Sequence, residues 1–268
     1  MDDATYPGLI VEREGSIQIV TLNRPESFNA LDVPLIDSLT ACFTDLCSRP
    51  DIRVVLLRAH GKHFCAGVNL KGWNDEIAEP SIVDSLRMQR RIVGIVRLMR
   101  TCSQPIIALG HGAAAGGGFS LMLASDVRFG APDLRMNAAY IKVGLGGCDI
   151  GSSYFLTRLI GSSLASELLL TGRFLHADRA LRLGLLSDVV DADKLLDTGL
   201  SLASEMLDIA PLALSLTKDA LNVNIDAPGF EAAVALEDRQ QVMLTTTVDH
   251  REAVNAFLEK RPPHFIAR

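Results

Sequence analysis

The sequence predicts an α/β fold with a helical C-terminal part. In the first two thirds, short apolar runs typical of buried strands alternate with amphipathic helical patterns. In the last third, the patterns are helical only. With 268 residues, of which 48% are hydrophobic, the chain can bury the core of one large domain, or of a domain with a small appendage.

The first half of the chain predicts a short strand pair and then alternating helices and strands. The predicted elements are strands 9–11 and 17–22, helix 34–46, strand 54–57, helix 82–99 and strand 106–109. The two strands of the pair flank Glu14 and Gly15, which predicts a tight turn. Residues 54–57 are apolar at every position and bounded by charges, as in a strand that is covered on both faces.

The second half is mostly helical. The predicted elements are helix 116–124, strands 127–129 and 134–136, and helices 152–160, 164–170, 177–183, 194–209, 212–223, 229–244 and 251–258. Residues 1–200 are therefore predicted to form the α/β core, and residues 201–268 a helical region. Apolar stripes on these last helices are longer than a small appendage could bury alone, which predicts self-association.

Two glycine-centred turns, residues 65–70 and 116–120, are the most informative feature. Each follows a predicted buried strand and leads towards a helix. A helix N-terminus leaves its first backbone N–H groups without intrahelical partners, so two such ends that converge can hold a negatively charged oxygen. The turns therefore predict an oxyanion hole, a site suited to making enolates. A dinucleotide site is the competing interpretation, but a G-x-G-x-x-G turn and its later acidic residue are not found together.

Composition excludes several function classes. A net charge of −6 and the lack of a basic stripe argue against a nucleic-acid partner. Five cysteines without a C-x-x-C pair indicate free thiols in a reducing compartment such as the cytoplasm, and no metal. The acidic N-terminus has no apolar stretch of the kind found in secretory signals, and no apolar run reaches the ~18 residues of a membrane span. We expect a soluble protein.

Several short motifs together resemble the enoyl-CoA hydratase/isomerase (crotonase) superfamily. The matching segments, in order and spacing, are residues 22–26, 64–67, 116–118, 170–173 with 180–185, and 249–252 with 257–261. The resemblance covers nearly the whole chain. It implies a crotonase-like spiral of ββα units, a C-terminal helical region that forms trimers or hexamers, and an acyl-CoA thioester as substrate, without a metal or redox cofactor.

The resemblance also assigns roles to individual residues. The backbone N–H groups of Val68 and Gly117 would hold the thioester oxygen. The remaining implied contacts are to coenzyme A: the backbone around Ala66, Asn69 and Leu70 at the adenine, Arg24 at a phosphate, and Lys260 reaching the coenzyme A of a neighbouring subunit.

The chain departs from the family where hydratases carry two glutamates, because Ser120 and Tyr140 stand there. A lone hydroxyl and a phenol of pKa near 10 are poor bases at neutral pH, so we expect slow hydration at best. Asp149 lies close to the place where dienoyl-CoA isomerases of this family carry an aspartate, and it could shuttle a proton. Its competing interpretation is an N-cap of the helix that starts near Ser152.

Other candidates have open alternatives. The Ser120 hydroxyl could return to the carbonyl of Gly116 instead of placing a water. Tyr140 could be a pocket wall, and Asp126 could tie down a helix end. The remaining polar candidates are Glu76 and Glu79, either of which could supply a missing carboxylate, Trp73 as a pocket residue, and His60, His63 and His111, whose spacing fits no metal set.

Together these observations predict an acyl-CoA-transforming enzyme of the enoyl-CoA hydratase/isomerase type, as used in fatty acid metabolism. Three alternatives stay open: a double-bond isomerase that uses Asp149, an acyl-CoA hydrolase, and an acyl-CoA binding protein without catalysis.

Overall fold

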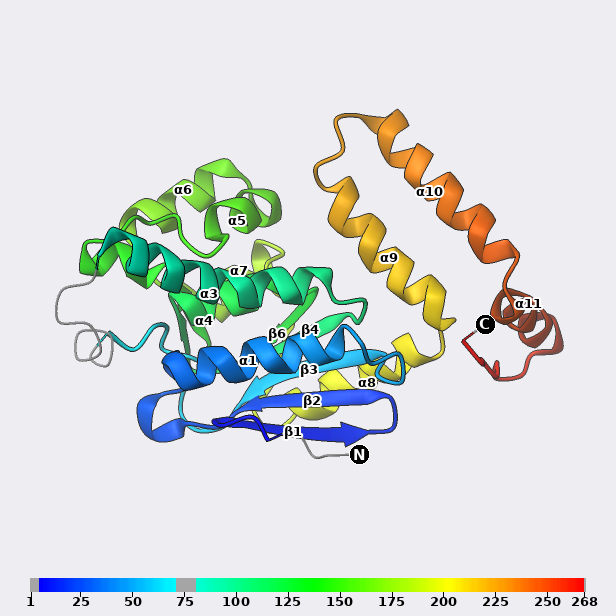
Figure 1. The fold of residues 1–268 in the computed structure, drawn as a ribbon, viewed down its shortest axis with the longest axis horizontal. Helices are drawn as coiled ribbons and strands as arrows, with labels where there is room; N and C mark the ends of the chain where they lie inside the picture. Colours follow the sequence, from blue (N-terminus) through cyan, green and yellow to red (C-terminus); the bar gives the residue numbers. More distant parts are fainter. Residues whose placement is uncertain (1–4, 71–80, 268) are drawn as a thin grey trace.

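The structure, a computed structural model, describes residues 5–70 and 81–267 and is built on a six-stranded sheet (Figure 1). Its strands, in spatial order, are β1 (Leu9–Glu14), β2 (Ile17–Leu22), β3 (Val54–Ala59), β4 (Ile106–Gly110), β6 (Val127–Gly130) and β9 (Asp188–Val189). The predicted tight turn joins β1 and β2 as an antiparallel pair, and every other neighbour pair in this sheet is parallel. The alternation of strands and helices was therefore predicted correctly.

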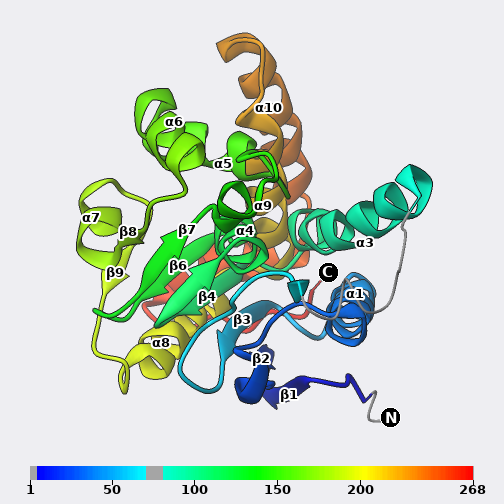
Figure 2. The same ribbon diagram turned by 90° about the vertical axis from the view of Figure 1, so that its left-hand side faces the viewer.

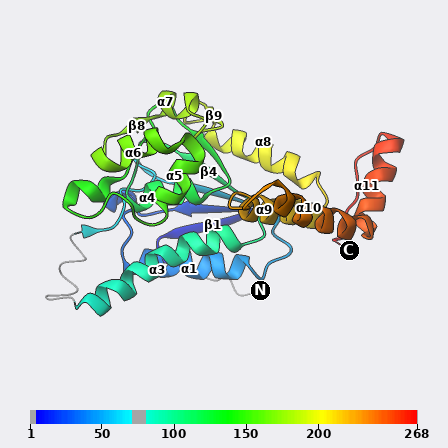
Figure 3. The same ribbon diagram turned by 90° about the horizontal axis from the view of Figure 1, so that it is seen from above.

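Helices cover both faces of the sheet (Figures 2 and 3). Val55 and Leu57 of β3 point into a core formed with α1 (Val33–Leu46) and α3 (Ile82–Thr101). Val54 and Leu56 point into a second core, on the opposite face, under α8 (Leu195–Leu207). Since successive side chains of a strand alternate between faces, burial on both sides explains why residues 54–57 of the strand are all apolar.

A second, three-stranded sheet lies beside the first. It contains β5 (Ala113–Ala115), β7 (Arg135–Asn137) and β8 (Leu175–His176). The sequence did not predict β5, β8 or β9, because β8 and β9 have two residues each and β5 is three alanines, so none of them shows an alternating pattern.

Short helices connect the sheets. They are the 3₁₀ segments η1 (Pro25–Ser27) and η2 (Ala139–Val143) and the α-helices α4 (Gly117–Ala124), α5 (Ser152–Ile160), α6 (Ser162–Thr171) and α7 (Ala177–Arg182). Every residue of α4 is buried, so this helix runs through the core between the two sheets and the layer of α3. Its N-terminus carries the second glycine turn.

The C-terminal helices α9 (Pro211–Asn224), α10 (Phe230–Thr245) and α11 (Val248–Glu259) extend away from the sheet (Figures 1 and 3). The boundary expected at residue 200 falls inside α8, whose Gly199 and Ala203 pack on the sheet. The helices that extend from the sheet therefore start with α9, whose Lys218 still bonds to the core. Within the described ranges no single helix is long and apolar enough to span a membrane, and only α8 and α9 together, bent by 110°, reach the length and composition of a span.

Candidate active site

The two glycine turns, about fifty residues apart in sequence, lie side by side. Cys65 N–H donates to Ala113 C=O (3.1 Å), and Ala115 N–H donates to Cys65 C=O (2.9 Å), so the first turn runs parallel to β5. β5 leads directly into Gly116 and the N-terminus of α4. Strand pairing thus brings both turns to one place.

Glycine permits this close approach. Gly67 has φ +92°, and a Cβ there would lie 2.8 Å from Ala115 O and 3.4 Å from Gly117 N. A Cβ on Gly118 would lie 2.3 Å from Cys65 O. Neither position can carry a side chain unless the two backbones separate.

Two N–H groups at this junction have no protein acceptor among the described residues. Around the first turn, the Leu31 N–H donates to the Gly67 C=O (2.7 Å), and the Asn69 N–H donates to the Leu31 C=O (2.9 Å). The N–H of Val68, between Gly67 and Asn69, makes neither of these bonds and has no backbone acceptor among the described residues. The Gly117 N–H, at the first position of α4, is likewise unpaired. Gly117 lies at the N-terminus of α4, which carries partial positive charge, so its N–H, together with the Val68 N–H, can stabilise an oxyanion.

Asp149 lies next to this junction. The Cδ1 atom of its neighbour Ile150 is 3.7 Å from the place a Cβ would take on Gly117. Asp149 Oδ1 accepts hydrogen bonds from the Ile150 N–H (2.7 Å) and from Nε2 of Gln89 on α3. The carboxylate is therefore held between the second turn and α3.

The N-cap interpretation of Asp149 is wrong. The N-cap of α5 is Gly151, and no side chain caps this helix. Instead Ser152 Oγ accepts from the Asp149 N–H (3.1 Å), and the Asp149 carbonyl accepts from the Ser152 N–H (2.8 Å). Two successive left-handed residues, Ile150 (φ +46°) and Gly151 (φ +81°), turn the chain, and the carboxylate bonds to α3 rather than to the first N–H groups of α5.

Ile150 is strained. Its φ of +46° is an outlier for a β-branched residue, and the side chain is buried, so rotation into a normal region would displace it from the core. Such a conformation costs about 1–3 kcal/mol and persists where the surrounding structure fixes it, which is common at functional sites. Sequence reasoning gave no sign of this feature, because the strain follows from tertiary packing.

Ser120 and Tyr140 meet behind the second turn. Ser120 Oγ lies 3.4 Å from the Tyr140 hydroxyl, which also donates to the Asp149 carbonyl (3.3 Å). The hydroxyl of Ser120 thus bonds to Tyr140 and not to the Gly116 carbonyl. The ring of Tyr140 packs 3.5 Å from the Cβ position of Gly116, as expected of a pocket wall. Burial raises the pKa of Tyr140, so the phenol is neutral at physiological pH and is not a base.

Arg24 and the first turn, which are expected at coenzyme A, lie on neighbouring segments, because Leu31 pairs with Val68. Ala66 and Leu70 are exposed beside the first turn, and Asn69 is half-buried there. Arg24 is paired with Asp32, and more loosely with Glu26 (3.8 Å).

Lys260 follows α11 as its C-cap, at the opposite end of the chain's fold from α4 (Figures 1 and 3). The structure therefore does not bring Lys260 to the site of its own chain. Trp73, Glu76 and Glu79 lie outside the described residues.

The histidines near the turns have structural partners. His63 Nδ1 accepts from the Ala113 N–H (3.2 Å), and burial lowers the pKa of His63. His111 Nε2 is 2.8 Å from Gly61 O, and His60 Nδ1 is 3.1 Å from Asn23 Oδ1. Across residues 5–70 and 81–267, no three His, Cys, Asp or Glu side chains group as metal ligands.

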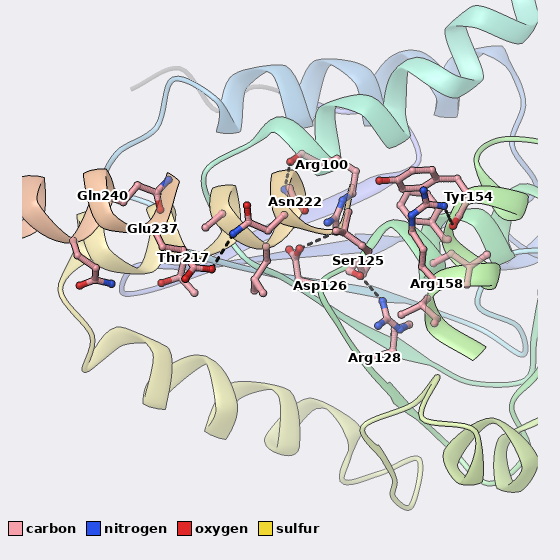
Figure 4. Close-up of a pocket in the computed structure, with 18 of the residues that line it drawn as sticks. Arg100, Ser125, Asp126, Arg128, Tyr154, Arg158, Thr217, Asn222, Glu237 and Gln240 are labelled. Carbon is pink, nitrogen blue, oxygen red and sulfur yellow. Dashed lines mark hydrogen bonds and ion pairs between the residues drawn. The ribbon is translucent and has the colours of Figure 1, made fainter. Parts of the chain in front are cut away.

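A cavity of about 980 Å³ lies elsewhere, near the C-terminal end of α4 and between α5 and the α9–α10 pair (Figure 4). Asp126 at its wall accepts from Arg100 (2.9 Å) and from the Ile106 N–H (2.8 Å), and forms an ion pair with Lys218 of α9 (2.9 Å). Asp126 therefore ties the chain after α4 to α3 and α9. The cavity contains none of the residues expected at an oxyanion hole.

Comparisons with known proteins find the same family along nearly the whole chain. Residues 12–268 match the family model described as enoyl-CoA hydratase/isomerase. The 2,3-dehydroadipyl-CoA hydratase of Escherichia coli K12 is 34% identical over 271 residues, which cover 97% of this chain and 99% of that protein.

Solved structures share the fold. The crystal structure of a protein described as an enoyl-CoA hydratase, from Streptomyces coelicolor A3(2), superposes with a TM-score of 0.94 at 33% identity. The match covers 100% of this chain and 97% of that protein. The enoyl-CoA hydratase of Polaromonas sp. JS666 gives 0.90 at 32% identity, covering 96% and 99%.

Proposed function

The chain belongs to the enoyl-CoA hydratase/isomerase family, and from this premise we propose that it forms the enolate of an acyl-CoA thioester and moves a proton along the acyl group. Val68 and Gly117 donate their N–H groups to the thioester oxygen. Asp149 removes and returns the proton. The reaction class is then a double-bond shift in an enoyl-CoA or dienoyl-CoA.

The oxyanion hole supplies most of the rate. Negative charge develops on the thioester oxygen when the α- or γ-proton leaves. The close approach of Gly67, the residue before Val68, to the Gly117 nitrogen (3.4 Å from the Gly67 Cβ position) supports two donors at one oxygen. Each donor of this kind contributes about 3–4 kcal/mol of transition-state stabilisation.

The position of Asp149 is the observation that favours isomerisation over hydration. Asp149 is the acidic residue beside Ile150, whose Cδ1 atom lies 3.7 Å from the Cβ position of Gly117. One carboxylate is sufficient to take a proton from one carbon and return it to another. Hydration needs a second group to activate water, and Ser120 and Tyr140 are neutral at the places where the family's hydratases carry glutamates.

In this proposal the protein binds its substrate through the coenzyme A part of the thioester, and it uses no cofactor. The backbone at Ala66, Asn69 and Leu70 binds the adenine, and Arg24 exchanges part of its pairing with Asp32 for a phosphate. Lys260 acts on the site of a neighbouring subunit, since its own site lies at the other end of the fold.

We propose a homotrimer or homohexamer, in the cytoplasm. Large apolar side chains stand exposed on the C-terminal helices: Leu221 (68%), Phe230 (77%), Val242 (67%), Phe257 (83%) and Leu258 (72%). Isolated in water these would form an unusually apolar surface, which association buries. Sedimentation should show three or six copies at micromolar concentration, and a monomer alone would contradict the proposal.

The reaction is tested with Asp149→Asn on crotonyl-CoA, 3-enoyl-CoA and dienoyl-CoA substrates, by double-bond shift and by exchange of substrate protons in D₂O. Asn keeps the side-chain volume, so the fold and the affinity for coenzyme A should remain. Isomerisation and exchange should fall by about 10²–10⁴-fold. Equal turnover in variant and wild type would remove Asp149 from the mechanism.

The same assays separate the alternatives. Hydration of crotonyl-CoA on the order of 10²–10³ s⁻¹ would mean that a second carboxylate activates water. Release of free coenzyme A would indicate a hydrolase. Tight acyl-CoA binding without exchange or turnover would indicate a binding protein.

A further inference from the structure

Gln89 and Asp149 are joined by a hydrogen bond although they lie 60 residues apart in the sequence. We propose that Gln89 is a positioning residue for the proton transfer: its amide fixes the plane of the Asp149 carboxylate, so that Oδ2 is the oxygen that exchanges the proton. This inference rests on the proposed role of Asp149.

Both hydrogen bonds to the carboxylate fall on the same oxygen. The Ile150 N–H (2.7 Å) and Gln89 Nε2 both donate to Oδ1, while Oδ2 has no partner among the described residues. An ionised carboxylate accepts at both oxygens, so this arrangement saturates one oxygen and leaves the other available. A proton acceptor needs such a free oxygen.

The two donors hold the carboxylate from two directions. The Ile150 N–H belongs to the same loop as the carboxylate. The Gln89 amide belongs to α3, a different element, and among the described residues it is the side chain that bonds the carboxylate itself to another element. Misplacing a reacting group by about 1 Å can cost about 10²-fold in rate.

The competing explanation is that Gln89 only anchors α3. The buried residues of this helix are all in its second half, at Ile92, Ile95, Val96 and Met99. Among the described residues, two side-chain hydrogen bonds join the first half to other elements, Gln89 with Asp149 and Arg91 with Asp37. Loss of the Gln89 bond would loosen this half, so activity alone cannot separate the two roles.

A double-mutant cycle separates them. Gln89→Leu removes the amide at similar size, and Gln89→Glu replaces the donor with a carboxylate of nearly the same shape. In the otherwise wild-type enzyme, both should lower kcat by about 10–100-fold and change KM less than 3-fold. In the Asp149→Asn background neither should lower the remaining exchange rate further, because a positioning residue has nothing left to position.

The control is Arg90→Gln, an exposed neighbour on α3, which should match wild type. Hydrogen exchange of residues 82–91 reports the anchoring of α3 independently of turnover. Equal fold-losses in both backgrounds would make Gln89 a structural anchor and overturn the inference, as would wild-type kcat in Gln89→Leu. A silent Asp149→Asn, measured alone, would instead refute the proposed function itself.

Discussion

Gly67 and Gly117 approach so closely that a Cβ on Gly67 would lie 3.4 Å from the Gly117 nitrogen and 2.8 Å from the Ala115 carbonyl oxygen. Both contacts are to backbone, which cannot rotate away as a flexible side chain can. The two turns can therefore lie this close together only because residue 67 is a glycine and has no Cβ.

Gly67→Ala should separate the two turns and lower kcat/KM by about 10²–10³-fold, the typical effect of losing an oxyanion donor. The φ of +92° adds strain, so the melting temperature should also fall. Steady-state kinetics and thermal unfolding check both effects.

Gly94→Ala is the matched control. Gly94 lies within α3, and nothing is within 4 Å of its Cβ position. Alanine there should raise stability by about 0.5–1 kcal/mol and leave turnover unchanged. Wild-type kinetics in both variants would show that the turns do not form the oxyanion hole.

Tyr140→Phe should keep turnover within about 10-fold of wild type. The phenol is neutral because burial raises its pKa, and its hydrogen bonds of 3.3 and 3.4 Å are long. The ring that supports Gly116 remains. Tyr140→Ala removes the ring and should destabilise the fold by about 3 kcal/mol. A thousand-fold loss in Tyr140→Phe would instead make the hydroxyl an acid in the reaction.

Lys218→Met should lower the free energy of unfolding by about 3–5 kcal/mol. Lys218 is 5% exposed, and its ammonium donates to the carbonyls of Met99 (3.0 Å) and Gln104 (2.7 Å) and pairs with Asp126 (2.9 Å). These bonds fasten α9 to the core, and their loss leaves a buried carboxylate with less compensation.

Lys194→Met serves as the comparison, because its pair with Asp191 is exposed and should contribute less than about 1 kcal/mol. Urea unfolding at one protein concentration measures both variants. Similar midpoints for the two would refute the anchoring role of Lys218.

Acid should release the C-terminal tail. Hydrogen bonds from Arg261 and the His264 N–H lower the pKa of Glu252 from 4.5 to about 2. Because the folded pKa is depressed, the stabilisation is complete above pH ~4.5 and disappears as the pH falls from there towards 2. Pepsin cleavage of residues 261–267 should accelerate across this range.

In Glu252→Gln the carboxylate is absent, so tail cleavage should be fast already at pH 4.5 and vary less with pH. A wild-type cleavage rate that follows only the intrinsic pH dependence of pepsin on an unstructured peptide would contradict this assignment.

The larger strands and helices could be predicted from the sequence, because burial of one face of an element produces a periodic pattern of apolar residues. Residues 54–57 are apolar throughout because two different helical layers cover β3, and such a pattern can be read without coordinates. The glycine turns could also be predicted from the sequence. Where two backbones approach this closely there is no room for a Cβ atom, so glycine is required.

The tertiary structure alone decided how the site is assembled. An aspartate three residues before a helix has the same residue type whether it caps the helix or serves another element, and the left-handed conformations of Ile150 and Gly151 removed the first possibility. Gln89 looks like any polar residue on an amphipathic helix, because its bond to Asp149 spans 60 residues. Periodicity records which face of an element is buried, whereas the meeting of two particular side chains depends on how distant elements pack, which no local pattern encodes.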